Sequence, residues 1–420
     1  MKLSQHNIPA GQINKCQVCG SSNLELVVDL GHQPLCDSLL TKSELNEPEI
    51  FYPLRLVRCV DCTLAQIDHV VAAEKVYHRA YPYRSGITKE LVEYQHSLAD
   101  TLYDRANLQP NSLVVDIGSN DGTLLKGFKK NGCQVVGVEP TDIALIANRD
   151  GIYTLNRPFD QSAADAVVAE KGPASLITAT NVFAHMASLG DVMEGMLTLL
   201  ADDGVIMIEN HYLLQILART QYDTIYHEHL RSYSLKSLMV LFGMFELEVF
   251  DATEVSRYGG NIRVLVCRKG KREIAQGVAD LIERERAFGL YGPEVYQSFA
   301  KRTEISRTGL LRFFLEAEAR GERVVGNSCP GRCATLLNYV GIDTQMMPYI
   351  AEQPTSLKLG LYLPGKHMPI VDNEILFREQ PDNVVLLAWH YGGPIAEQLR
   401  ARGLRSRLVL PLPELTILEA

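Results

Sequence analysis

Apolar runs and amphipathic stretches alternate along most of this 420-residue chain. Short apolar runs bounded by turn residues predict buried strands, and apolar positions three to four residues apart predict helices. An amphipathic pattern predicts a helix over 87–106. Apolar runs then predict strands at 112–117, 134–140, 174–180, 204–210 and 258–264, with helical segments between several of them. This alternation is typical of an α/β domain built on an open sheet.

A second region with a similar pattern follows a charged segment. Residues 271–320 are charged and helix-favouring, and we expect them to form a solvated helical connector without chemistry. After it, the pattern predicts a strand entering a turn at 323–328, a helix at 334–339, and strands at 384–390 and 408–411. These elements indicate a second α/β unit.

Composition and charge narrow the function classes. The chain is 46% hydrophobic and 22% charged. With 41 basic and 50 acidic residues, its formal net charge is 41 − 50 = −9 at pH 7. This balance argues against nucleic acid as a partner. The start lacks the apolar run of a signal peptide, and no apolar segment reaches bilayer length. We therefore expect a cytoplasmic protein without a membrane partner, in which nine cysteines serve as metal ligands or free thiols.

The cysteines near the start form two pairs with the spacing of zinc knuckles. Cys16 and Cys19 form one C-x2-C pair, and Cys59 and Cys62 form the other. Two thiolates from one tight turn can bind a single tetrahedral Zn²⁺, so the two pairs predict a zinc site of four cysteines. A closed site of four thiolates has no open coordination position, which indicates a structural role for the zinc. We interpret Cys36, which lies between the pairs, as a small buried hydrophobic residue.

The first strand of the α/β domain runs into a glycine-containing loop. The loop reads D-x-G-x-x-x-G, and the next strand ends in an acid 21 residues after the first glycine. Such an acid can accept hydrogen bonds from ribose hydroxyls, while the dinucleotide pattern G-x-G-x-x-G is absent. We therefore predict S-adenosylmethionine as the cofactor. The candidate cofactor-binding residues are Asp116, Gly118, Asn120, Gly122, Glu139 and Asn181.

Two imidazoles, a carboxylate and a phenol occur in the four residues Tyr226, His227, Glu228 and His229. Buried polar groups at this density are costly without partners, and imidazole can remove a proton near neutral pH. In an extended segment, His227 and His229 would share one face and Tyr226 and Glu228 the other. A solvated polar loop would also accommodate them, and position alone does not say which histidine is the base.

Other candidates lie near the same crevice or could cover it. His185 follows the predicted strand 174–180, where open α/β sheets bind ligands, although a helix-capping or core histidine would fit the same position. Tyr81 and Tyr83 belong to a segment rich in Tyr and Arg. That segment is either an interdomain linker or a cover over a ligand pocket.

Several of these motifs together resemble the bacterial sugar C-methyltransferases, over nearly the whole chain. The motifs that carry the resemblance are at 115–120, 179–185, 222–230, 336–339 and 364–367. Members of this family methylate nucleotide-linked keto-deoxysugars during antibiotic and surface-glycan biosynthesis. The resemblance implies a class I methyltransferase domain with a Rossmann-like fold, between a zinc module and a second Rossmann-like α/β domain. We place these units at 1–75 (zinc-binding module), 76–270 (methyltransferase), 271–320 (helical connector) and 321–420 (substrate-binding domain).

The resemblance also implies catalytic roles. His229 would remove the proton from the carbon next to the sugar ketone, with Glu228 and Tyr226 orienting the base and the sugar. His185, with Tyr81 or Tyr83, would stabilise the enolate oxygen. The carbon would then receive the methyl group of S-adenosylmethionine. An enolate-forming enzyme of another type, such as an isomerase, and a non-catalytic nucleoside-binding scaffold are the alternatives.

One segment departs from the family pattern. The family usually carries a glycine- and alanine-rich turn ending in Lys-Gly, suited to phosphates, where this chain has Gly326-Asn327-Ser328-Cys329-Pro330-Gly331-Arg332-Cys333. The two cysteines are interpreted as free thiols. Arg332 could still meet an anion, and Arg323 and Lys366 are candidate phosphate contacts, with ordinary surface charge as the alternative. The substrate is therefore expected to be a ketone, with or without a linked nucleotide.

Overall fold

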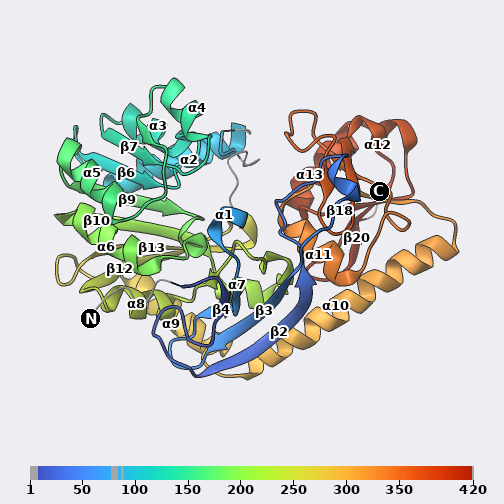
Figure 1. The fold of residues 1–420 in the computed structure, drawn as a ribbon, viewed down its shortest axis with the longest axis horizontal. Helices are drawn as coiled ribbons and strands as arrows, with labels where there is room; N and C mark the ends of the chain where they lie inside the picture. The colour runs from blue at the N-terminus through green and yellow to red at the C-terminus, as the bar shows by residue number, and fades with distance from the viewer. Residues whose placement is uncertain (1–7, 77–83, 87–88, 419–420) are drawn as a thin grey trace.

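The computed structural model describes residues 8–76, 84–86 and 89–418. Tyr81 and Tyr83 lie outside the described residues. Three sheet-containing units follow one another along the chain, and Figure 1 shows the second and third as separate lobes. Among the described residues, no helix is long and apolar enough to cross a membrane.

The N-terminal unit is an antiparallel sheet that includes one strand, β11, from the central part of the chain. Its order is β11-β4-β3-β2, and a separate pair joins β1 to β5. The elements are β1 (Gly11–Gln12), β2 (Leu24–Gln33), η2 (Glu44–Asn46), β3 (Tyr52–Cys59), β4 (Ala65–Ile67), β5 (His69–Val70), α1 (Ala73–Val76) and β11 (Arg231–Ser232). Because β11 directly follows the Tyr226–His229 segment, the N-terminal sheet holds one end of that segment in place.

The central unit has a seven-stranded sheet of order β8-β7-β6-β9-β10-β13-β12. The strands are β6 (Leu113–Ile117), β7 (Gln134–Val138), β8 (Thr154–Leu155), β9 (Ala174–Thr180), β10 (Leu200–His211), β12 (Leu247–Val255) and β13 (Asn261–Arg268). β13 runs antiparallel to both of its neighbours, and the other neighbouring pairs are parallel. The order reverses between β6 and β9, the point at which an open α/β sheet presents a ligand crevice.

Helices cover both faces of this sheet because its central strands are apolar on both sides. They are α2 (Lys89–Arg105), α3 (Thr123–Lys130), α4 (Ala144–Arg149), α5 (Gln161–Lys171), α6 (Leu189–Leu199), α7 (Leu213–Ala218) and α8 (Leu235–Gly243). One-turn 3-10 helices lie at η3 (Phe183–His185), η4 (Tyr222–Thr224) and η5 (Arg257–Gly259). Val114, Leu176 and Met207 pack in one hydrophobic cluster with Leu98 of α2. Their neighbours along the strands belong to the other cluster.

The C-terminal unit repeats this architecture with the order β16-β17-β15-β14-β18-β19-β20. The five inner strands are parallel and the two edge strands antiparallel. Its elements are β14 (Val324–Asn327), α11 (Arg332–Val340), β15 (Ile350–Glu352), β16 (Tyr362–Leu363), β17 (Met368–Asp372), α12 (Glu374–Glu379), β18 (Asn383–Leu386), η6 (Trp389–Tyr391), α13 (Gly392–Ala401), β19 (Arg407–Leu410) and β20 (Thr416–Leu418). Its order reverses between β14 and β18, the point at which such a sheet presents a ligand crevice.

Two helices, α9 (Gln276–Phe288) and α10 (Glu294–Ala319), join the lobes. They occupy the range expected to be a solvated connector, but that expectation is wrong for Glu285, which is fully buried. Its carboxylate accepts hydrogen bonds from the Tyr212 and Tyr291 hydroxyls and from the Leu235 backbone N–H at the start of α8. The residue boundaries given above for the four units remain predictions.

Candidate active site

The glycine loop after β6 makes a tight turn against the end of β9. Gly118 has φ +68°, and a Cβ atom there would lie 2.5 Å from Val182 Cγ1. Gly122 has φ +74°, and Asn120 between them has φ +52°. This backbone conformation strongly favours glycine, and the close approach to Val182 leaves no room for a side chain at Gly118.

The acidic side chains near this loop have different surroundings. Glu139, just beyond β7, accepts a hydrogen bond from the Asn120 backbone N–H at 3.1 Å and another from the Thr141 backbone N–H. Asp116 is 5% exposed and accepts the Thr178 hydroxyl at 2.6 Å. Burial raises the pKa of Asp116 to about 7. Glu139 thus braces the loop, while Asp116 is held in the sheet.

Unpartnered polar atoms lie along this carboxyl edge, as an adenosyl ligand requires. Among the described residues, Ser119 Oγ and Thr180 Oγ1 are buried without a hydrogen-bond partner. Asn181, with φ +54°, donates its backbone N–H to the Glu209 carbonyl and accepts the Asn261 amide at 3.0 Å. The loop, the acid beyond β7 and these free oxygens fit S-adenosylmethionine.

The Tyr226–His229 segment forms a turn after η4, so the expected alternation of faces is wrong. The His229 backbone N–H donates to the Tyr226 carbonyl at 2.9 Å, which curls the chain and brings the two rings to a centroid distance of 4.0 Å. His227 points elsewhere: its Nε2 lies 3.2 Å from the Pro53 carbonyl oxygen of the N-terminal unit. The two histidines therefore have separate environments.

His229 is held in one tautomer by the backbone. Its Nδ1 lies 2.7 Å from the Thr224 carbonyl oxygen. A carbonyl oxygen only accepts, so Nδ1 carries the proton and the lone pair is on Nε2. Burial lowers the pKa of His229 to about 4, so the ring is neutral at pH 7. This is the state of a histidine that can accept a proton.

Further titratable side chains surround His229. The rings of His185 and His211 each lie 4.9 Å from that of His229. Glu228 Oε2 is 4.0 Å from His185 Nδ1. Burial lowers the pKa of His185 and His211 and raises that of Tyr226. Sequence reasoning missed His211, although it ends β10 at the same sheet edge that made His185 a candidate.

The C-terminal unit reaches the same segment through a buried ion pair. Arg332, at the start of α11, contacts both carboxylate oxygens of Asp223 at 2.7 and 2.8 Å. Trp389 Nε1 donates to Asp223 Oδ2 at 2.8 Å. The anion that Arg332 meets is thus a carboxylate of the protein. The strand expected at 384–390 ends at Leu386, because Trp389 and its neighbours turn into η6 to face the central unit.

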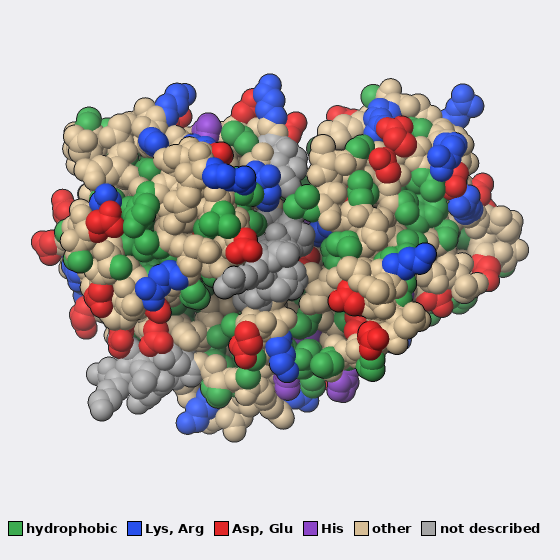
Figure 2. Space-filling view, turned by 45° about the horizontal axis from the view of Figure 1, so that its top comes forward, with side chains coloured by type: hydrophobic (Ala, Val, Ile, Leu, Met, Phe, Trp, Pro, Cys, Tyr) green, Lys and Arg blue, Asp and Glu red, His purple; other side chains and the backbone are tan. Residues whose placement is uncertain are grey.

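The other two phosphate candidates lie apart from this contact. Arg323 sits at the amino end of β14, opposite the crevice, and pairs with Glu379 at 2.8 Å. Its placement there is inconsistent with a phosphate contact at the carboxyl edge. Lys366 lies half-buried in the β16–β17 turn, beside Gly365, whose backbone N–H donates to Glu49. On the face in Figure 2, acidic and basic side chains are interspersed over the described surface.

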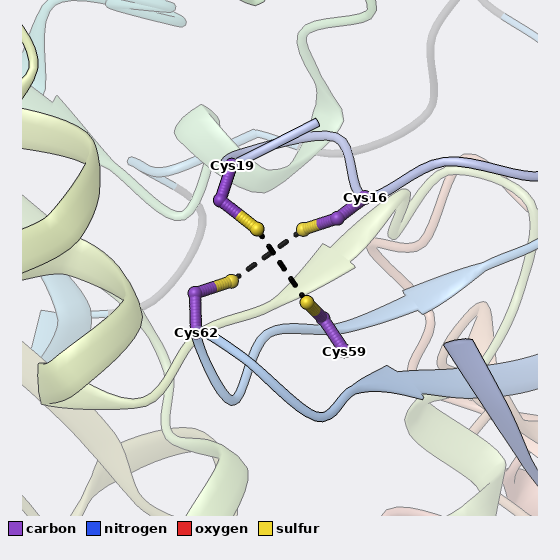
Figure 3. A group of neighbouring side chains, drawn as sticks. All are labelled: Cys16, Cys19, Cys59 and Cys62. Carbon is purple, nitrogen blue, oxygen red and sulfur yellow. Dashed lines mark hydrogen bonds between the residues drawn. The ribbon is translucent and has the colours of Figure 1, made fainter. Parts of the chain in front are cut away.

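The four knuckle cysteines converge on one point, as Figure 3 shows. Cys16 Sγ lies 3.4 Å from Cys62 Sγ, and Cys19 Sγ lies 3.5 Å from Cys59 Sγ. All four sulfur atoms lie within 4.8 Å of one another. Tetrahedral zinc, with Zn–S bonds of about 2.3 Å, requires sulfur atoms about 3.8 Å apart. The geometry fits a closed structural Zn²⁺ site.

Comparisons with known proteins identify each unit. Residues 16–77 match a family model described as "Putative zinc binding domain", 91–252 match "Methyltransferase domain", and 256–413 match "C-methyltransferase C-terminal domain". The C-methyltransferase NovU of Streptomyces niveus is 32% identical over 413 residues, covering 97% of both chains. The chain belongs to the bacterial sugar C-methyltransferase family. It is an S-adenosylmethionine-dependent C-methyltransferase with a zinc-binding N-terminal module, which removes the non-catalytic scaffold as an alternative.

Solved structures resemble parts of this C-methyltransferase more distantly. An S-adenosylmethionine-dependent methyltransferase from Clostridium acetobutylicum is 13% identical and covers 43% of this chain and 92% of its own, with a TM-score of 0.34. Magnesium protoporphyrin IX methyltransferase from Synechocystis, solved with bound SAH, is also 13% identical. It covers 42% of this chain and 83% of its own, with a TM-score of 0.33.

Proposed function

We propose that this C-methyltransferase removes a proton from the carbon next to the ketone of a keto-deoxysugar and methylates that carbon. The observation that carries the proposal is His229, whose Nδ1 is held by the Thr224 carbonyl and whose Nε2 is left as an acceptor. A neutral, buried imidazole with one nitrogen fixed is suited to general-base catalysis. The reaction needs such a base, because a carbon acid must lose its proton before it can attack a methyl group.

The residues around His229 take the remaining roles. Tyr226, whose ring packs on the His229 ring, and Glu228 orient the base and the sugar. His185, at a ring-centroid distance of 4.9 Å from His229, stabilises the enolate oxygen. Tyr81 and Tyr83 stay in the proposal for that oxygen on sequence grounds. His211 borders His229 on another side and is added here as a residue that shapes the substrate site.

S-adenosylmethionine, when bound, supplies the electrophilic methyl group. Gly118 and Gly122 let the backbone approach the ligand, and Glu139 accepts the ribose hydroxyls while it braces Asn120. Asn181, just after β9, is held by its hydrogen bonds to Glu209 and Asn261 and lines the other side of the proposed cofactor site. Asp116 supports the loop from within the sheet. The contribution of these residues is to hold the carbon nucleophile and the methyl group in line, with water excluded.

A small-molecule substrate fits the relationship to NovU, and we propose a nucleotide-linked sugar as its form. The C-terminal unit is joined to the central unit through Arg332 and Asp223, and we expect it to bind the part of the substrate beyond the sugar. A nucleotide handle would have to be held by groups other than Arg332 and Arg323, since both are paired with carboxylates. The free form of the sugar is therefore tested beside the nucleotide-linked form.

The experiment follows the proton and the methyl group separately. Keto-deoxysugars, free and nucleotide-linked, are incubated with the enzyme in deuterated water without S-adenosylmethionine, and exchange at the carbon next to the ketone is measured by NMR. Adding the cofactor should then give the methylated product by mass spectrometry. Exchange without any methylation would favour an isomerase-like enzyme. Methylation at oxygen, or at a carbon without exchange, would contradict the proposal.

A further inference from the structure

A cysteine of the N-terminal unit lies beside the carboxylate of Glu228. Cys36 follows β2, is 3% exposed, and its Sγ is 3.7 Å from Glu228 Oε1. The other carboxylate oxygen of Glu228 faces His185 Nδ1 at 4.0 Å. The carboxylate of Glu228 thus lies between side chains of two different units.

The thiol of Cys36 is suited to donating to this carboxylate. Burial raises its pKa well above the ordinary value, and the negative charges of Glu228 and Asp37 raise it further. The thiol therefore stays protonated and its S–H points a partial positive charge at Glu228 Oε1. An S–H group is a weak hydrogen-bond donor. This hydrogen bond is buried, however, and a low local dielectric makes a hydrogen bond electrostatically stronger than it is in water.

Asp37, the residue after Cys36, contacts the C-terminal unit. Asp37 Oδ1 lies 3.5 Å from Lys358 Nζ, which itself donates to the Cys329 carbonyl at 2.8 Å. Asp37 Oδ2 sits so close to Gly331 that a Cβ atom there would lie 2.6 Å from it. Asp37 thus links this short segment of the N-terminal unit to the turn before α11.

We propose that Cys36 is a positioning residue that holds Glu228 in its productive orientation, so that the zinc-binding module contributes directly to the methyl-transfer site. This inference rests on the proposed function of the site. The side chains of Cys36, Asp37 and Glu228 are also close enough together to bind a cation. The ammonium of Lys358 already supplies positive charge beside Asp37, which disfavours a second metal ion there.

The test compares two substitutions at Cys36 with one at another buried cysteine. Cys36→Ala removes the donor and should lower kcat roughly tenfold, with KM for S-adenosylmethionine unchanged. Cys36→Ser keeps a donor and should restore kcat to within about twofold of wild type. Cys133→Ala, at a cysteine just before β7 in a hydrophobic cluster of the central unit, should leave kcat unchanged. If the alanine variant does not fold, Cys36→Val, which fills the space without a donor, takes its place.

Two measurements separate the possible outcomes. Equal kcat in wild type and Cys36→Ala, or a serine variant as slow as the alanine variant, would overturn the role of Cys36 while methyl transfer by the wild type upholds the proposed function. No exchange or methylation by the wild type would instead refute the proposed function. Metal analysis should give one zinc per chain in wild type and Cys36→Ala alike. Two in the wild type and one in the variant would make Cys36 a metal ligand and overturn the hydrogen-bonding role.

Discussion

At the scale of single residues, the two histidines of the Tyr226–His229 segment provide a matched pair. They are two positions apart and both buried, but only His229 faces His185 and His211. We expect His229→Gln to lower kcat by roughly 10²- to 10⁴-fold, because the general base is lost. Calorimetry should show unchanged binding of S-adenosylmethionine.

His227→Gln is the control for that substitution. The His227 ring contacts Tyr52 and the Pro53 carbonyl, so its replacement should lower thermal stability while kcat stays within about threefold of wild type. If instead His227→Gln abolished methylation and His229→Gln did not, the base would be His227.

The depressed pKa of His229 predicts an unusual pH profile. With a pKa of about 4, roughly a tenth of the free enzyme has a protonated base at pH 5, whereas an ordinary histidine would be almost fully protonated. We therefore expect kcat/KM to keep more than half of its neutral value at pH 5. Initial rates from pH 5 to 8 test this, and an acid limb centred near pH 6.5 would contradict it.

The lowered pKa of His229 also makes the folded protein less stable at acid pH, which limits the pH range over which rates can be measured. Because the unfolded chain protonates this histidine near pH 6.5 and the folded chain only near pH 4, stability falls as the pH drops from 6.5 towards 4. Activity regained at pH 7 after incubation at pH 5 serves as the control for unfolding or loss of zinc.

At the scale of secondary structure, sequence patterns located most strands of the central sheet and missed what depends on tertiary contacts. Strand 174–180 agrees with β9, because its apolar run is buried on both faces. No pattern indicated β12, and the strand expected from Tyr258 begins only at Asn261, since Tyr258 has φ +56°. The burial of Glu285 could not be predicted from sequence patterns either, because it depends on tertiary contacts. Two of its partners, Tyr212 just after β10 and Leu235 at the start of α8, lie 73 and 50 positions away in sequence.

For the site, the sequence identified residue types and left their orientation open. The four knuckle cysteines and the glycine loop have fixed spacing, so local geometry was enough to predict them. An extended Tyr226–His229 segment was the wrong expectation, because His229 donates hydrogen bonds to the Thr224 and Tyr226 carbonyls and these determine its turn. The contact between Cys36 and Glu228 joins residues 192 positions apart and required the fold.

The docking of α11 on η4 gives a prediction at this scale. Asp223 is fully buried and is held by Arg332 and by Trp389, the single tryptophan of the chain. Arg332→Met should destabilise the junction by about 3–5 kcal/mol, because it leaves a buried carboxylate without its countercharge. Trp389 fluorescence should shift in the native state, and urea should unfold the junction at a lower concentration.

Arg320→Met is the matched control for Arg332→Met. Arg320 pairs with Glu322 on the surface at the end of α10, and such exposed pairs contribute only about 0–1 kcal/mol. Its urea midpoint and Trp389 emission should match those of wild type. A wild-type urea midpoint in Arg332→Met would show that the ion pair does not hold α11 to the Tyr222–Thr224 turn.

At the scale of the whole molecule, the three units meet at one short segment of the central unit. The N-terminal sheet pairs β4 with β11, which begins two residues after His229, and the C-terminal unit holds Asp223, three residues before Tyr226. The segment between these anchors carries the proposed base. The cofactor loop at Gly118–Gly122, in contrast, follows β6 of the central sheet and contacts Val138 at the end of β7 and Val182 just after β9. Catalysis and cofactor binding should therefore depend differently on the zinc module.

Removing the zinc tests this division of roles. Cys59→Ser replaces one of four ligands at the end of β3, so zinc content and thermal stability should fall, by several kilocalories per mole if the module unfolds. Methyl transfer should be lost with the zinc, because β11 and the Cys36 contact both depend on the module. Binding of S-adenosylmethionine, measured by calorimetry, should persist.

Cys267→Ser is the control for Cys59→Ser. Cys267 is a buried cysteine of β13 outside the zinc module, so its replacement should leave zinc content unchanged. Full methylation by a zinc-free Cys59→Ser enzyme would show that the module is dispensable for catalysis, and loss of cofactor binding together with the zinc would show that the central sheet cannot hold its loop without it.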